Sequence, residues 1–131
     1  MLINYEIETN IYYIKTYDIS IKDLNNFITY FKNIFNKKKN FSIIFDLTEI
    51  VIKDFLFSKR IINFMEENKN NTTKYLNKTA IILNNKIIIT LLNNFIFSIY
   101  KPLKPNIITN NLENCISFIK DNSNNIIQII Y

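Results

Sequence analysis

Near the start of the chain, within Leu2–Glu8, the apolar residues Ile3, Tyr5 and Ile7 alternate with polar ones. A period of two residues is typical of a half-buried strand, so we predict one over this range. A second strand is predicted over Ile11–Tyr17, with Tyr12 and Tyr13 pointing to opposite faces. Thr9–Asn10 is short enough to join the two strands as a hairpin, although it lacks the glycine that tight turns prefer.

After the second predicted strand, the spacing of the apolar residues lengthens to that of a helix. Apolar residues recur on one face from Ile21 to Phe35, after Ser20 as N-cap and with Asp23 at the capping-box position. We predict a helix here that ends near Lys37–Lys39. Cations at that point complement the helix dipole, so we interpret the three lysines as a solvated helix end rather than a phosphate-binding patch.

Short apolar runs alternate with helical patterns in the rest of the chain. Strands are predicted over Phe41–Asp46, Thr79–Leu83 and Asn106–Thr109, and helices from Lys53–Asp54 to Glu67, after Asn84–Asn85, and after Asn110–Asn111. The inward residues predicted for these helices are Phe57, Ile61, Ile62 and Met65, then Ile88, Leu91, Leu92, Phe95 and Ile99, then Leu112, Cys115, Ile116 and Ile119. Asn68–Lys78 is polar and predicted to be a loop, and the prolines make Lys101–Pro105 extended.

The order of these elements predicts the fold class. A β-hairpin followed by α-β-α-β-α-β-α indicates a single α/β domain over residues 1–131 with a mixed sheet. Residues 121–131 are expected to add an edge strand or a docking tail, because Ile126–Tyr131 is apolar and uncharged. We expect one core to contain Ile28, Phe31, Ile43, Phe45, Ile62, Ile82, Leu92 and Ile116.

The composition excludes several classes of site. The chain has no Gly, no His and a single Cys, Cys115. Phosphate-binding glycine loops, His-dependent catalysis and thiolate metal clusters are therefore excluded, and we expect no enzyme activity, no cofactor and no metal. Cys115 is interpreted as a buried small hydrophobe, and the single cysteine is compatible with a reducing compartment.

The formal net charge of +5 comes almost entirely from lysine. Ile, Asn and Lys follow A+T-rich codons, so the charge is weak evidence for a nucleic-acid partner, and we expect no specific one. The apolar region Ala80–Tyr100 is interrupted by Asn84–Asn85 and Asn93–Asn94, so we predict no membrane span. The first residues lack a basic start and a long apolar stretch. We therefore expect no signal peptide and a soluble, cytoplasmic protein.

The element order, with an apolar strand that ends in Asp-Leu-Thr within Phe41–Thr48, resembles the STAS domain family. The second half is similar to the STAS-like branch grouped with lipid-binding CRAL-TRIO proteins. The segments that carry this similarity are Thr79–Leu83, Lys101–Pro105 and Asn111–Ile119. The resemblance implies a non-enzymatic regulatory module, or a domain that binds a lipid or a nucleotide.

The chain departs from this family at the regulatory serine. The STAS family includes the anti-sigma-factor antagonists, in which a serine stands at the start of the helix after the central strand, in an Asp-Ser-Ser-Gly setting. Here Asp54 is present, but Phe55 and Leu56 occupy the serine positions and Ser58 is displaced. We therefore do not expect the usual phosphorylation switch.

Candidate contact residues follow from the expected sheet. Open α/β sheets bind ligands at the carboxyl ends of their parallel strands, where Asp46, Glu49 and Asp54 are predicted to lie. The simpler interpretation is strand-end solvation for Asp46 and helix capping for Asp54. Ser58, Lys101 and Lys104 complete the set of predicted ligand or partner contacts.

Three functions stay open at this point. The first is an interaction or regulatory module that binds a protein partner or a second copy of itself. The second is a carrier of a small ligand such as a lipid or a nucleotide. The third is a structural component of a larger assembly, which applies if the A+T-rich codons come from a virus or parasite genome.

Overall fold

A computed structural model of the chain describes residues 2–17, 21–50, 56–91, 104–121 and 127–130. Within these ranges, only the backbone is described for residues 21, 56–58, 88, 91 and 127–130. The described elements form one small α/β domain with a six-stranded mixed sheet.

The strands lie in the sheet in the order in which they occur along the chain. They are β1 (Leu2–Glu8), β2 (Ile11–Thr16), β3 (Phe41–Asp46), β4 (Leu76–Ile82), β5 (Asn106–Thr109) and β6 (Ile127–Ile130). β1 and β2 form the predicted antiparallel hairpin, and every later neighbour pairs in parallel. The predicted α/β class and mixed sheet are therefore confirmed.

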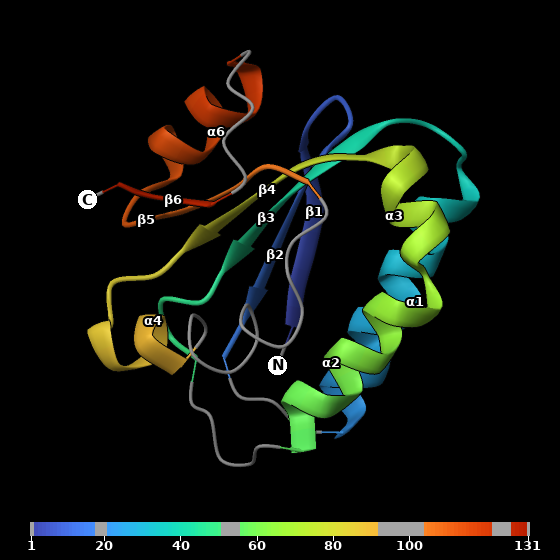
Figure 1. The fold of residues 1–131 in the computed structure, drawn as a ribbon, viewed down its shortest axis with the longest axis horizontal. Helices are drawn as coiled ribbons and strands as arrows, with labels where there is room; N and C mark the ends of the chain where they lie inside the picture. The colour runs from blue at the N-terminus through green and yellow to red at the C-terminus, as the bar shows by residue number, and fades with distance from the viewer. Residues whose placement is uncertain (1, 18–20, 51–55, 92–103, 122–126, 131) are drawn as a thin grey trace.

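Helices cover both faces of this sheet. They are α1 (Ile21–Asn36), α2 (Leu56–Glu67), α3 (Lys69–Tyr75), α4 (Lys86–Leu91) and α6 (Leu112–Lys120). α1, α2 and α3 lie on one side of the sheet and α6 lies on the other (Figure 1). We call these two sides the α1 face and the α6 face.

The hairpin turn is made without glycine. Asn10 has a φ of 60°, in the left-handed region that asparagine tolerates better than most residues. Its backbone N–H donates to Glu6 Oε2 at 2.9 Å. A register shift between Glu6 and Glu8 places a bulge at the end of β1.

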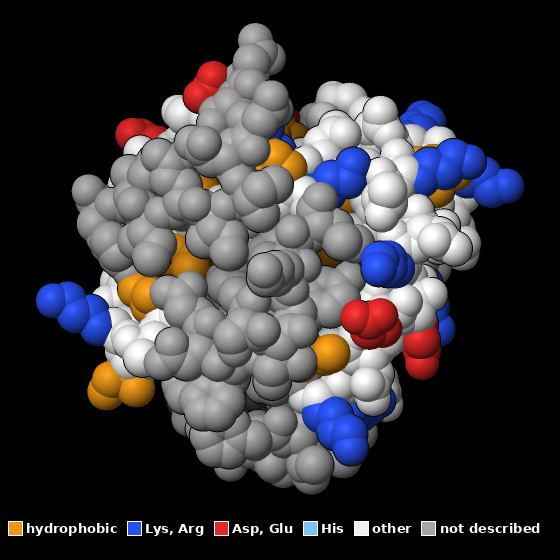
Figure 2. Space-filling model, viewed as in Figure 1, with side chains coloured by type: hydrophobic (Ala, Val, Ile, Leu, Met, Phe, Trp, Pro, Cys, Tyr) orange, Lys and Arg blue, Asp and Glu red, His pale blue; other side chains and the backbone are white. Residues whose placement is uncertain are grey.

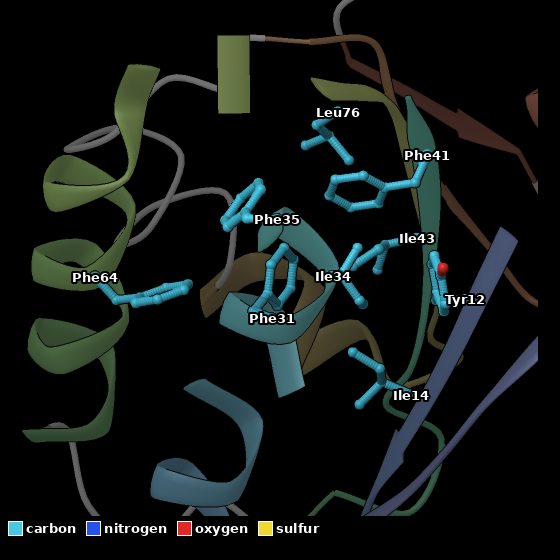
Figure 3. Packing of buried hydrophobic residues seen from close by; sticks show 9 residues of the cluster. All are labelled: Tyr12, Ile14, Phe31, Ile34, Phe35, Phe41, Ile43, Phe64 and Leu76. Atoms are coloured by element: carbon cyan, nitrogen blue, oxygen red, sulfur yellow. The ribbon is translucent and has the colours of Figure 1, made fainter. Parts of the chain in front are cut away.

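The core on the α1 face is largely aromatic. It consists of Tyr12, Ile14, Phe31, Ile34, Phe35, Phe41, Ile43, Phe64 and Leu76. Figure 3 shows Phe31 and Ile34 of α1 between the sheet and Phe64 of α2. The predicted amphipathic face of α1 therefore packs on β2 and β3, and α2 closes the cluster from outside.

The C-terminal end of α1 is tied to the sheet. Lys38 has a φ of 53°, and its N–H donates to the carbonyl of Phe35 at 3.1 Å. The Lys37 ammonium donates to the Tyr12 hydroxyl at 3.1 Å and lies 5.0 Å from the centre of that ring. All three lysines are exposed, as the predicted solvated helix end requires, and the Lys37 ammonium also binds the hydroxyl of buried Tyr12.

The core on the α6 face is separate from the first. It consists of Ile11, Ile44, Ala80, Ile82, Ile107, Cys115 and Phe118. Tyr12 and Tyr13 divide between the two faces as predicted. A third cluster, of Ile81, Leu83, Ile89 and Ile108, packs α4 on β4 and β5.

The prediction of one shared core is therefore wrong. Phe31 and Ile43 lie on the α1 face, whereas Ile82 and Ile116 pack on the α6 face. A sheet covered on both sides separates its clusters, because successive side chains of a strand point to opposite faces. Ile28, Phe45, Ile62 and Ile116 are half-buried, and Leu92 lies outside the described residues.

The prediction of a polar loop over Asn68–Lys78 is also wrong. α3 occupies most of it, and β4 begins at Leu76 rather than at Thr79. Helical hydrogen bonds continue through Asn68, whose N–H donates to the carbonyl of Phe64 and whose carbonyl accepts from Thr72. α3 buries no side chain, so the sequence carries no amphipathic pattern that reveals it.

Two helices bury different residues from those predicted. In α2, Phe64 is buried while Ile61, Ile62 and Met65 are half-buried. In α6, Cys115 is buried as predicted, but Phe118 is buried as well and Leu112 in the first turn is exposed. Both differences arise because packing sets the rotation of each helix about its axis. That rotation decides which side chains face the sheet.

Caps and a buried lysine hold α6 in place. The predicted cap Asn111 accepts from the N–H of Asn114 at 2.8 Å. At the other end the ammonium of buried Lys78 donates to the carbonyl of Phe118 at 2.7 Å and to the carbonyl of Asp121. A cation at a helix C-terminus compensates free carbonyls and the helix dipole, so this lysine joins β4 to α6.

The cap of α4 and the C-terminal strand also agree with the predictions. Asn85 caps α4 as predicted, because its side chain accepts from the N–H of Ile87 at 2.9 Å. Residues 127–130 form β6, so the apolar tail adds a strand beside β5 in its own sheet. The predicted cap Ser20 lies outside the described residues. Across the described ranges, no helix has the length and apolar character that crossing a membrane requires.

Candidate functional site

The carboxyl ends of β2 and β3 bring two of the predicted contact residues together, Asp46 and Glu49. Asp46 ends β3 opposite Lys15 of β2. Glu49 follows in the next turn, and its Oε2 lies 3.1 Å from the Lys15 ammonium. Prediction and structure therefore agree that these two acids lie at this end of the sheet.

Asp46 is buried, at 8% exposure, so strand-end solvation was the wrong interpretation. Its Oδ1 accepts from the Thr48 hydroxyl at 2.6 Å and from the Thr48 N–H at 3.1 Å. Its Oδ2 accepts from the hydroxyl of Tyr13, one strand away. The carboxylate thus closes its own turn and links β3 to β2.

Burial, followed by the hydrogen bond to Asp46, raises the pKa of Tyr13 above its ordinary value. The tyrosine therefore stays a neutral donor to the carboxylate. Glu49, followed by the charge of Asp46, raises the pKa of Lys15 against a smaller opposing effect of desolvation. Tyr13, Lys15, Asp46 and Glu49 each have a partner within this cluster. The cluster therefore joins the end of β2 to the end of β3.

The remaining predicted contacts do not join this cluster. Lys104 precedes β5 and therefore lies at the opposite end of the parallel strands from Asp46. Ser58 lies in α2, where only its backbone is described. Asp54 and Lys101 lie outside the described residues. Within the described part of the chain, no group of His, Cys, Asp and Glu is arranged to hold a metal ion.

A groove of about 540 Å³ lies between β1 and α1. It is lined by Leu2, Asn4, Lys22, Asp23, Asn26, Thr29, Tyr30 and Asn33. Burial raises the pKa of the Tyr30 hydroxyl to about 12, so it stays protonated at neutral pH. Seven of the eight lining side chains carry a polar or charged group, so the groove offers hydrogen-bond partners along its length.

The basic charge does not gather in one block on the face shown in Figure 2. Visible lysine and arginine side chains are spread around its rim, and acidic side chains lie beside some of them.

The outer edge of β1 is a feature that the sequence prediction missed. β1 ends the strand order, and among the described residues no strand pairs with its outer side. Ile3 and Tyr5 are 39% and 47% exposed, although the alternating pattern predicts a half-buried strand. Tyr5 lies across from Tyr13 with 5.0 Å between ring centres, which places the exposed pair on the α6 face.

An edge strand with large exposed apolar side chains is a site at which another strand can add. The alternation within Leu2–Glu8 was the available signal, but a sequence does not show which strand ends the sheet. Comparison with known proteins found no matching family model, no matching curated protein and no matching solved structure.

Proposed function

We propose that this chain is a non-enzymatic protein-interaction module that binds its partner through the outer edge of β1. The observation that carries this proposal is the exposure of Ile3 and Tyr5 on a seven-residue edge strand. Unpaired backbone groups supply the affinity when a strand is added, and side chains on alternate positions supply the specificity.

The acidic cluster at the ends of β2 and β3 supports the same proposal. Asp46 accepts three hydrogen bonds from Tyr13 and Thr48, and Glu49 is paired with Lys15. A general base needs a lone pair directed at a substrate, whereas Asp46 is buried and both of its oxygens accept from its own chain. The regulatory role implied by the STAS resemblance belongs to this proposal and rests on the element order.

A library of random peptides displayed on phage tests the proposal, because it samples many candidate partner sequences at once. We expect enrichment of extended peptides with apolar residues at alternate positions. These peptides should lose binding to the variant Ile3→Lys/Tyr5→Lys, because a lysine on an edge strand opposes strand addition. Ile87→Lys is the matched control, since Ile87 is 73% exposed on α4, away from β1.

Two results count against the proposal. One is the absence of any peptide that binds the wild-type chain above background when the chain is dilute enough to be monomeric. The other is a set of peptides that bind the edge variant as well as they bind the wild-type chain and the Ile87→Lys control.

A further inference from the structure

We propose that the partner of the β1 edge is a second copy of this chain, and that the two β1 strands pair antiparallel about a two-fold axis at Asn4. This inference rests on the proposed function, since it uses the same edge. It adds the identity of the partner and the register of pairing. The product is a continuous sheet that runs through both copies.

The bulge determines the register. Regular pairing of β1 with β2 runs from Leu2 to Glu6, and the register shifts between Glu6 and Glu8. A bulge bends and twists a strand, so the flat segment available to a new strand ends at Glu6. Its middle residue is Asn4, which is therefore the residue that faces itself in a symmetric antiparallel pair.

This register matches the exposed apolar side chains to each other. With Asn4 on the axis, Ile3 lies opposite Tyr5 of the partner subunit, and Tyr5 lies opposite the partner subunit's Ile3. Ile3 and Tyr5 stand on one face and are 39% and 47% exposed in the single chain. Pairs of an aromatic and a β-branched residue are among the favourable cross-strand contacts, and here the symmetry makes the contact twice.

The charges of β1 do not oppose this pairing. Glu6 accepts a hydrogen bond from the Asn10 N–H at 2.9 Å, and Glu8 forms an ion pair with Lys120 at 2.9 Å. Both acids are thus engaged within their own chain. β1 also contains neither the lysine nor the proline with which edge strands are commonly protected from association.

Symmetry favours β1 over the other edge of the sheet. β6 spans four residues, whereas β1 spans seven. Pairing of β1 with the partner subunit's β6 would be head-to-tail and would continue into open-ended assemblies. Pairing of β1 with itself closes after two copies.

Analytical ultracentrifugation of the full chain tests the stoichiometry. We expect a dimer that dissociates on dilution. For Ile3→Lys/Tyr5→Lys we expect a dissociation constant at least about a hundredfold higher, and for Ile87→Lys an unchanged one. A wild-type chain that stays monomeric, a ladder of larger species, or an edge variant that remains dimeric overturns the inference.

A cysteine scan tests the register independently of the lysine variants. Paired residues of antiparallel strands have Cα atoms about 4.5–5.5 Å apart, which suits a disulfide. Asn4→Cys should therefore cross-link into a dimer faster than Ile3→Cys, Tyr5→Cys or the control Ile87→Cys. The native Cys115 is fully buried and can stay in place.

Equal rates for all four cysteine variants would overturn the register, and with it the inference. The two proposals fail separately. A monomeric chain whose β1 edge still selects peptides retains the proposed function and refutes only the dimer. A dimer through β1 that selects no peptide supports both proposals, with the second copy as the partner, whereas a monomeric chain that selects no peptide refutes both.

Discussion

Phe31→Ala removes the ring at the centre of the α1-face core. Phe31 is 8% exposed, and its ring centre lies 5.3–6.2 Å from those of Phe27, Phe35, Phe41, Phe45 and Phe64. These neighbours come from α1, β3 and α2, so a single side chain joins three elements. Its removal leaves a cavity that none of the three can fill alone.

The expected loss of stability is large. Truncation of a buried phenylalanine to alanine lowers the free energy of unfolding by about 3–5 kcal/mol, and a domain has about 5–15 kcal/mol in total. For a chain of this size the melting temperature should fall by roughly 10–20 °C. Phe31→Leu keeps much of the apolar volume, so we expect a smaller loss.

Urea unfolding followed by circular dichroism measures this loss. Ile87→Ala is the matched control, because Ile87 is 73% exposed and surface substitutions change stability by about 0.5 kcal/mol or less. The urea dependence of the free energy should be the same for all variants if only the native packing changes. A loss below about 1 kcal/mol for Phe31→Ala would refute the packing of α1 and α2 on the sheet.

Two further predictions concern pH and the C-terminal strand. Burial raises the pKa of Cys115 to about 12 from 9.0, and burial also raises the pKa values of Tyr13 and Tyr30. Above pH 9 the unfolded chain releases protons that the folded chain retains, so the free energy of unfolding should fall as the pH rises. The slope should be up to about 1.4 kcal/mol per pH unit for each of these groups. Urea unfolding from pH 8 to pH 11 checks the direction of this change. Cys115→Ala should lack the part of the loss that begins near pH 9. A free energy of unfolding that stays constant over this range would contradict the prediction. Deletion of residues 126–131 removes β6 and leaves the edge of β5 unpaired, so we expect a lower melting temperature or aggregation. A truncated chain with unchanged melting temperature, oligomeric state and solubility would show that β6 contributes nothing.

Local patterns were sufficient to predict most elements. The alternation in Leu2–Glu8 predicted β1, the helical period after Ile21 predicted α1, and the apolar run Phe41–Asp46 predicted β3. Asn85 and Asn111 cap their helices as expected, because capping depends on residues within one turn of each other. These features are encoded over short stretches of chain, which is why a sequence shows them.

The candidate site depended on the sheet more than on local sequence. The position of Asp46 and Glu49 at a strand end was predictable, but the hydrogen bond from Tyr13 joins residues 33 apart in the chain. That contact turned an expected solvated carboxylate into a buried one. Lys78 is similar, since a lysine in a polar stretch gave no sign that it would be buried beneath the end of α6.

The sequence alone determined most of the element types and their order, because periodicity and capping are properties of short stretches of the chain. Only the tertiary structure decided which strands end the sheet and which side chains each helix buries. Ile3 and Ile7 belong to the same alternating strand, yet Ile7 is half-buried against the α6-face core and Ile3 is 39% exposed. Burial of a strand residue depends on neighbours that are distant in sequence, so the exposed edge of β1 could be recognised only once the sheet was complete.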